Sequence, residues 1–229
     1  PNTIVSKSPY SSPNWHPSGN FIGFNHTPLD SITFPHGKEC DGRQYFNEDS
    51  SGFWLINPDG TNKRRILPYQ LQTPTWSPDG NWIAFVREAQ IYKMPFNKAE
   101  EKFDTNQIVK LTSEGRNFFS VWSNDGEWIA YSQSVCEDQK KCGIWLTNSD
   151  DNQKRFLIQY GSYPNWDPNK QEKLIYMTNS IDSNGNDIGD SLWAININNF
   201  DDKKLLKFIG ENNVYNRYCK YSTSGNYIA

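Results

Sequence analysis

The sequence predicts an all-β protein built as a β-propeller of about five four-stranded blades. Two observations lead to this fold class: one hairpin motif returns along the whole chain, and two further strand-like segments follow most of its copies. The composition agrees, because only 35% of the 229 residues are hydrophobic while nine Trp, twelve Tyr and thirteen Phe supply large apolar side chains. Thin sheets that bury a few large aromatic residues fit this balance.

The clearest copy of the motif occupies residues 74–85, with the sequence Pro-Thr-Trp-Ser-Pro-Asp-Gly-Asn-Trp-Ile-Ala-Phe. Two short runs rich in aromatic and β-branched residues flank a Pro-Asp-Gly turn, as expected for paired strands. Pro78 presets φ, Asp79 can bond its own backbone, and Gly80 can take the positive φ that closes the turn. This stretch therefore predicts a β-hairpin.

Related copies begin near residues 13, 120, 164 and 221, and each carries an aromatic marker at the same place. The markers are Trp15, Trp76, Trp122, Trp166 and Tyr221, separated by 61, 46, 44 and 55 residues. Repeats of about 40 to 50 residues are typical of propeller blades. Third strands are expected at 52–56, 90–94, 143–147 and 191–195, and fourth strands at 65–67, 108–111, 155–157 and 204–206.

The segments Trp76-Ser-Pro-Asp-Gly80 and Trp122-Ser-Asn-Asp-Gly126, with the strands that follow them, resemble the TolB-like, WD-type propeller repeat. The same repeat occurs in the propellers of tricorn-like and prolyl-oligopeptidase-like peptidases. The resemblance implies a single propeller over residues 1–229, although Trp166 lacks the turn glycine after it and Tyr221 replaces Trp. The blades would span roughly 13–69, 70–113, 114–159, 160–209, and a split blade made of 1–12 with 210–229.

The split blade is expected to be incomplete, because the C-terminal hairpin supplies two inner strands and residues near Ile4 and Val5 the outermost one. Its third strand is then missing, which leaves an open assembly edge formed by Ile4, Val5, Tyr227 and Ile228. Three interpretations remain open: a piece of a longer protein, an N-terminal strand that moves inward to leave three strands, or a strand donated by another copy.

One end of the propeller is the predicted binding face. Loops between second and third strands open on the same end as the connections between blades, and the longest are 26–51, 179–190 and the loop between two cysteines. The residues assigned to this face are His36, Cys40, Cys136, Cys142, Asp182 and Asp190. Loop lengths that vary without function are the alternative interpretation.

The four cysteines are an even number, and their spacing matches no zinc motif. We expect a disulfide between Cys136 and Cys142, and a second between Cys40 and Cys219 on the same face. Disulfides would indicate an oxidising compartment, so the predicted location is extracytoplasmic, either periplasmic or secreted. Four free thiols in a cytosolic protein are the alternative.

The segment 182–190 places oxygen-bearing side chains at positions 1, 3, 5 and 9, namely Asp182, Asn184, Asn186 and Asp190. This pattern resembles the calcium loops of integrin-type propellers, since calcium prefers oxygen ligands. Asp187 stands where such loops usually have glycine, and a polar turn without a ligand is the simpler interpretation. No other cofactor is expected.

The sequence offers no catalytic motif, because it contains neither Gly-x-Ser-x-Gly nor His-Glu-x-x-His. A net charge of −3 without a basic cluster argues against nucleic acid, and no apolar run is long enough to span a bilayer. We therefore expect a non-catalytic, extracytoplasmic interaction or assembly module that binds a protein partner or further copies of itself through strand donation. The alternative is the substrate-gating propeller of a serine peptidase whose catalytic domain lies outside this chain.

Overall fold

The computed structural model describes residues 10–33, 43–150, 153–181, 187–210, 219–222 and 224–228. Strands dominate, and the prediction of an all-β propeller is confirmed. The helices within these ranges are short 3-10 turns, such as Thr105–Gln107 and Gln139–Lys141, and none of them is long and apolar enough to cross a membrane.

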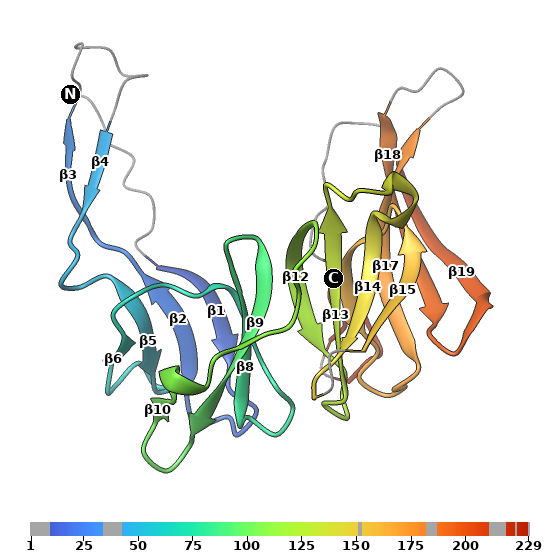
Figure 1. Cartoon of the computed structure of the whole chain (residues 1–229). Coiled ribbons are helices and arrows are strands. Elements are labelled where there is room, and N and C mark those ends of the chain that lie inside the picture. Colours follow the sequence, from blue (N-terminus) through green and yellow to red (C-terminus); the bar gives the residue numbers. More distant parts are fainter. Residues whose placement is uncertain are drawn as a thin grey trace. The chain divides into compact units, whose positions relative to one another are not determined.

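Three sheets have four strands in simple antiparallel order. Figure 1 labels the strands of the first and third of the four main sheets. The first contains β1 (Tyr10–Trp15), β2 (Ile22–His26), β5 (Gly52–Ile56) and β6 (Arg64–Leu67). The third contains β12 (Arg116–Trp122), β13 (Trp128–Ser134), β14 (Gly143–Asn148) and β15 (Lys154–Gln159). The fourth contains β16 (Ser162–Trp166), β17 (Lys173–Ile181), β18 (Asp187–Asn196) and β19 (Asn199–Gly210). Each sheet begins with the repeated hairpin, and the expected third and fourth strands follow it.

The second sheet carries an insertion. It contains β7 (Gln72–Trp76), β8 (Trp82–Arg87), β9 (Gln90–Asn97), β10 (Lys102–Phe103) and β11 (Val109–Lys110). Both β10 and β11 pair with β9, so an extra hairpin and a 3-10 turn interrupt the place of the fourth strand. This insertion forms one wall of a pocket that is described below.

Three segments differ from the sequence-based expectation. The long first-blade insertion contains its own two-stranded sheet, β3 (Leu29–Thr33) with β4 (Arg43–Phe46). The expected loop 179–190 is largely a continuation of β17 and β18, because the pairing extends through Asn179 and Asp190. Residues 10–12 belong to the first sheet rather than to a split blade, since Tyr10 already pairs with His26.

The fifth copy of the hairpin is present at the end of the chain. Tyr221 pairs with Ile228 in an isolated bridge, and the Ser222 N–H donates to the carbonyl of Tyr227 over 2.8 Å. Ile4 and Val5, which would complete the assembly edge with Tyr227, lie outside the described residues. The composition of the split blade therefore stays a prediction.

The chain forms two compact units, Pro1–Ile83 with Met94–Ile108, and Ala84–Lys93 with Val109–Ala229. In the first unit, Trp76 of the second sheet packs on Phe53 of the first, with ring centroids 6.5 Å apart. In the second unit, Trp166 of the fourth sheet joins a buried cluster with Ile144 and Leu146 of the third. In these two cases the repeated Trp packs on the preceding sheet of its own unit. The prediction of one domain over the whole chain remains a prediction.

Candidate functional site

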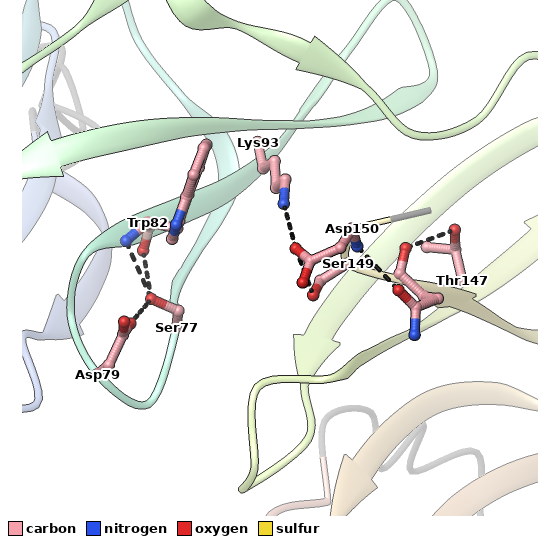
Figure 2. Close-up of polar contacts among 8 residues, drawn as sticks. Ser77, Asp79, Trp82, Lys93, Thr147, Ser149 and Asp150 are labelled. Carbon is pink, nitrogen blue, oxygen red and sulfur yellow. Dashed lines mark hydrogen bonds and ion pairs between the residues drawn. The ribbon is translucent and has the colours of Figure 1, made fainter. Parts of the chain in front are cut away.

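In the Ser-x-Asp turn of the repeat, the Ser and Asp side chains form hydrogen bonds within the turn itself (Figure 2). Ser77 Oγ donates to Asp79 Oδ1 over 2.5 Å and accepts from the N–H of Trp82 over 3.0 Å. Partial burial raises the pKa of Asp79, but hydrogen bonds from Ser77 and Asn81 outweigh this and lower it. Ser123 and Asp125 make the same contact over 2.5 Å in the third sheet. This Ser and Asp pair is therefore part of the scaffold.

Adjacent hairpin turns are joined by side chains that reach the next turn's backbone. The Nε2–H of His16 donates to the carbonyl of Gly80 over 3.0 Å, while its Nδ1 accepts from the N–H of Ser18. Asn169 donates in the same manner to the carbonyl of Ser224 over 2.7 Å. Burial lowers the pKa of His16, although the bond to Gly80 opposes this. These contacts hold the hairpin turn of one sheet against the hairpin turn of the next sheet.

A buried lysine links the second and third sheets within the second unit (Figure 2). Lys93 in β9 is 5% exposed, and its Nζ lies 3.3 Å from Asp150 Oδ1 in the turn after β14. Ser149 Oγ also contacts that carboxylate, over 3.2 Å. A Lys, Ser and Asp in contact could suggest catalysis. Because the same contacts satisfy a buried ammonium group, a structural role accounts for them fully.

Three residues before the repeated Trp, the first strand of each of the four main sheets has an unusual backbone, and in β1, β12 and β16 the pairing shifts there as in a β-bulge. The residues there have left-handed backbone although none is glycine: Ser12 (φ 53°), Thr73 (φ 45°), Phe119 (φ 56°) and Tyr163 (φ 53°). Bulges re-aim side chains, and left-handed backbone at such residues costs about 1–3 kcal/mol each. Phe119 and Tyr163, on the first strands of the third and fourth sheets, contact each other with ring centroids 4.3 Å apart.

A disulfide-bonded rim at one end of the third sheet is the best candidate for a binding surface. We use the name disulfide rim for Val135, the 136–142 loop and Tyr160. Cys136 and Cys142 form a disulfide with Cα atoms 5.6 Å apart, so the predicted pairing is present. The Tyr160 N–H donates to the Cys142 carbonyl over 2.9 Å, which ties the start of the next blade to the loop.

Two large hydrophobic residues project from the disulfide rim into solvent. Val135 is 69% exposed and Tyr160 is 67% exposed, and both have left-handed backbone, at φ 54° and 58°. For a β-branched residue such as Val135 this conformation is a clear outlier. Gly143 allows the close approach, because a Cβ there would overlap the carbonyl of Ile158 and crowd the Tyr160 nitrogen. The fold thus holds two apolar side chains outward at a cost in strain.

Sequence reasoning found the disulfide of this rim but missed its exposed residues. Val135 directly precedes the cysteine loop and Tyr160 directly follows the fourth strand, so their positions in the repeat were the available signal. Exposure itself was not readable from the sequence, because single hydrophobic residues occur both in cores and on surfaces.

The remaining predicted site residues are only partly described. Asp190 lies in β18, opposite Asn179, and is buried at 9% exposure. His36, Cys40, Asp182, Asn184 and Asn186 lie outside the described residues, so the calcium site stays a prediction. Among the described residues, no three His, Cys, Asp or Glu side chains gather as a metal site would require.

Cys219 is a free thiol in the described structure, half-buried, with its Sγ 3.6 Å from Met177 Sδ. Burial and the carboxylate of Asp190 raise the pKa of this thiol, which keeps it protonated and unreactive at neutral pH. Its expected partner, Cys40, lies outside the described residues. The second bridge therefore stays a prediction.

Two tyrosines at the same repeat position are fully buried. Burial raises the pKa of both Tyr131 and Tyr176, and the Glu114 carboxylate adds to the effect at Tyr131. Such tyrosines stay neutral at physiological pH and cannot act as bases. Tyr131 and Tyr176 therefore serve as core residues of their sheets.

Comparison with solved structures identifies propellers. The oligogalacturonate lyase of Vibrio parahaemolyticus is 11% identical, with a TM-score of 0.62 over 97% of this chain and 62% of that one. The β-propeller domain of the Trilobed protease from Pyrococcus furiosus is 12% identical, with a TM-score of 0.53 over 90% of this chain and 58% of that one. The Pyrococcus horikoshii acylaminoacyl peptidase is 13% identical, with a TM-score of 0.54 over 90% of this chain and 33% of that one. At these identities the likeness shows the fold alone.

Among curated proteins, the uncharacterized protein YidR of Escherichia coli K12 is 25% identical over 100 residues. That alignment covers 42% of this chain and 22% of the relative. The chain thus spans about a fifth of this relative's length and less than two thirds of the lyase chain.

A family model described as the dipeptidyl peptidase IV (DPP IV) N-terminal region matches residues 48–164. The match begins before β5 and runs through the second and third sheets to β16, so it includes Trp76, Trp122 and the disulfide rim. It covers more than half of the 229 residues. The chain therefore belongs to the family of DPP IV N-terminal regions.

Proposed function

We propose that the chain is the non-catalytic propeller of a larger serine-peptidase-like protein whose catalytic domain lies outside these residues. The family match over residues 48–164 carries this proposal. The fold similarity to the propellers of two peptidases is compatible with it. In this role the propeller positions and admits peptides, while a nucleophile elsewhere in the protein cleaves them.

The disulfide rim is the part of the propeller that we assign to peptide contact. Exposed apolar side chains on a rigid backbone bind at a lower entropic cost than those on a mobile loop, since the backbone is already ordered. Val135 and Tyr160 meet this description, and the Cys136 to Cys142 bond holds the loop between them. The disulfide also supports an extracytoplasmic location, because such bonds persist mainly in oxidising compartments.

The complete reading frame and its product test the proposal. We expect the frame to encode a Gly-x-Ser-x-Gly segment beyond these residues and the full-length product to hydrolyse peptides. Replacing both Val135 and Tyr160 with Ser should raise KM for peptides while leaving kcat for a minimal chromogenic ester unchanged. A matched control is Val109→Ser, which alters an exposed valine on β11, away from the rim.

A frame that stops soon after Ala229, with no peptidase activity in its product, would reject the peptidase role. The interaction or assembly module, which the sequence first suggested, would then become the better proposal. Strand donation between copies would be visible as filaments or rings of the purified protein, whereas a strictly monomeric product would reject it.

A further inference from the structure

The insertion in the second sheet builds a pocket that the proposed function does not use. The pocket has a volume of about 550 Å³ and lies entirely within the first unit. We call it the insertion pocket, and it is lined by Asn81, Trp82, Pro95, Phe96, Asn97, Glu100, Lys102, Phe103, Asp104 and Gln107. Most of the wall comes from residues 95–107. Volumes of this order are typical of sites for small organic ligands.

The wall of the insertion pocket is fixed by its own hydrogen bonds. The Asp104 carboxylate accepts from the Asn106 N–H over 3.1 Å and from Gln107 Nε2 over 2.7 Å. The Asp104 N–H donates to the Pro95 carbonyl over 3.0 Å, and the Phe96 N–H donates to Asn81 over 2.7 Å. The pocket is therefore formed before any ligand arrives, which lowers the entropic cost of binding.

Aromatic residues anchor the insertion to the core. The ring of Phe103 lies parallel to that of Trp76, with centroids 5.6 Å apart, and 4.8 Å from the ring of Phe96. Phe103 and Trp82 both remain partly exposed. The pocket thus combines a rigid aromatic part with a polar rim.

The polar edge of the insertion pocket carries side-chain groups that make no hydrogen bond within the described parts of the chain. The exposed Glu100 carboxylate and Lys102 ammonium make no hydrogen bond or ion pair within the described ranges. Asn97 uses only its amide oxygen, which accepts from two backbone N–H groups, so its NH₂ is available. Gln107 uses only its NH₂, so its amide oxygen is available. Two donors and two acceptors therefore remain around one pocket.

These groups select a class of ligand. The free charges of Glu100 and Lys102 cancel, and the nearby Asp104 carboxylate opposes a second negative charge, so an anion is not favoured. Lys102 in turn opposes a metal cation. A suitable ligand is neutral, donates and accepts several hydrogen bonds, and presents an apolar face to Trp82 or Phe103. A sugar ring has all three properties, because each hydroxyl donates and accepts while the C–H groups form an apolar face.

We propose that the insertion pocket binds a neutral pyranose sugar, and that Glu100, Lys102 and Gln107 hold its hydroxyls. This site is independent of peptide contact at the disulfide rim, so either proposal can fail without the other. An extended peptide is the competing occupant, and the experiment includes it as an outcome.

The test uses isothermal titration calorimetry of the whole chain with maltotriose, cellotriose and mannotriose. We expect at least one of these neutral trisaccharides to bind saturably. Lys102→Ala and Gln107→Ala should each weaken that binding by about tenfold, the effect of losing one good hydrogen bond. Thr105→Ala, an exposed residue of the same 3-10 turn that does not line the pocket, should leave the affinity unchanged.

Thermal unfolding of each variant confirms that it is folded, which is expected because Lys102 and Gln107 are exposed. Absence of binding by all three sugars would overturn the proposal. Sugar binding that persists in both Lys102→Ala and Gln107→Ala would overturn it as well. An Ala-Pro-Ala-Pro peptide that binds in place of the sugars and responds to the same variants would assign the pocket to peptide.

Discussion

At the scale of single residues, His16 shows how the repeat uses one side chain for two contacts. As a neutral ring it donates to Gly80 and accepts from Ser18, so both nitrogens are satisfied in the fold. A second proton would place a donor opposite the Ser18 N–H and a charge in a buried site. This explains why the fold favours the neutral form and lowers the pKa of His16, with burial as the main cause.

The lowered pKa predicts a loss of stability on mild acidification. The folded pKa lies below the unfolded value of 6.5, so the unfolded state binds the proton first. The contribution of His16 is complete above about pH 7.5 and declines as the pH falls through about 6.5 and below. Urea unfolding between pH 8 and pH 5 should show this decline, and His16→Gln should reduce it.

The matched control for this series is Asn20→Ala, an exposed residue of the same turn. It should keep the wild-type dependence on pH. If the free energy of unfolding changes equally with pH in wild type and His16→Gln, another group controls stability between pH 8 and pH 5.

At the scale of elements, substitutions of Gly80 and Gly60 distinguish two contributions to stability. One is the backbone conformation of a turn, and the other is the contact between neighbouring turns. Both have positive φ, at 70° and 85°. A Cβ on Gly80 would overlap the ring of His16, whereas nothing lies within 4 Å of a Cβ on Gly60. Gly60→Ala should therefore cost about 1 kcal/mol from backbone strain alone. Gly80→Ala should cost about 2 kcal/mol or more, because it adds the overlap.

Chemical denaturation of both variants measures this difference. The double variant His16→Ala with Gly80→Ala should recover the part due to overlap, which makes the two substitutions non-additive. Additive losses of unfolding free energy would mean that a Cβ at position 80 does not overlap the His16 ring.

The same elements show how much the sequence alone could predict. The hairpins were predictable, because Pro-Asp-Gly chemistry acts within a few residues and the repeat supplied several examples. The sheet formed by β3 and β4, the extension of β17 and β18, and the insertion at β10 were missed, because these local hairpins lack the Pro-Asp-Gly turn that marks the repeat. The left-handed bulge at Phe119 and Tyr163 was missed because its residues are not glycine.

The candidate site was predictable to a similar degree. The Cys136 to Cys142 bond followed from cysteine count and spacing, but the outward direction of Val135 and Tyr160 did not. The insertion pocket had no local signal, because its walls come from the second sheet and the 3-10 turn after β10. Binding surfaces of this kind arise from the tertiary arrangement of ordinary residues.

At the scale of the whole molecule, the repeated Trp residues differ in how far they are buried. Trp76, Trp122 and Trp166 are 5–9% exposed, whereas Trp15 of the first sheet is 58% exposed. Trp166→Ala should cost about 3–5 kcal/mol, because it leaves a cavity in a buried cluster. Trp15→Ala should cost clearly less than Trp166→Ala, since more than half of the Trp15 surface remains in water.

Urea unfolding of the two variants tests this contrast, with m-values compared to confirm that the same structure unfolds. Similar losses at both positions would show that Trp15 is covered in solution by another blade or another molecule. That result would revise the account of the first sheet.

Labelling of an active-site serine can show whether the proposed larger serine-peptidase-like protein has its nucleophile outside this propeller. The full-length gene product is treated with a fluorophosphonate probe, digested, and analysed by mass spectrometry to locate the labelled serine. We expect the label on the serine of a Gly-x-Ser-x-Gly segment outside residues 1–229. A label on a serine within residues 1–229, or no label on a folded full-length product, would contradict it.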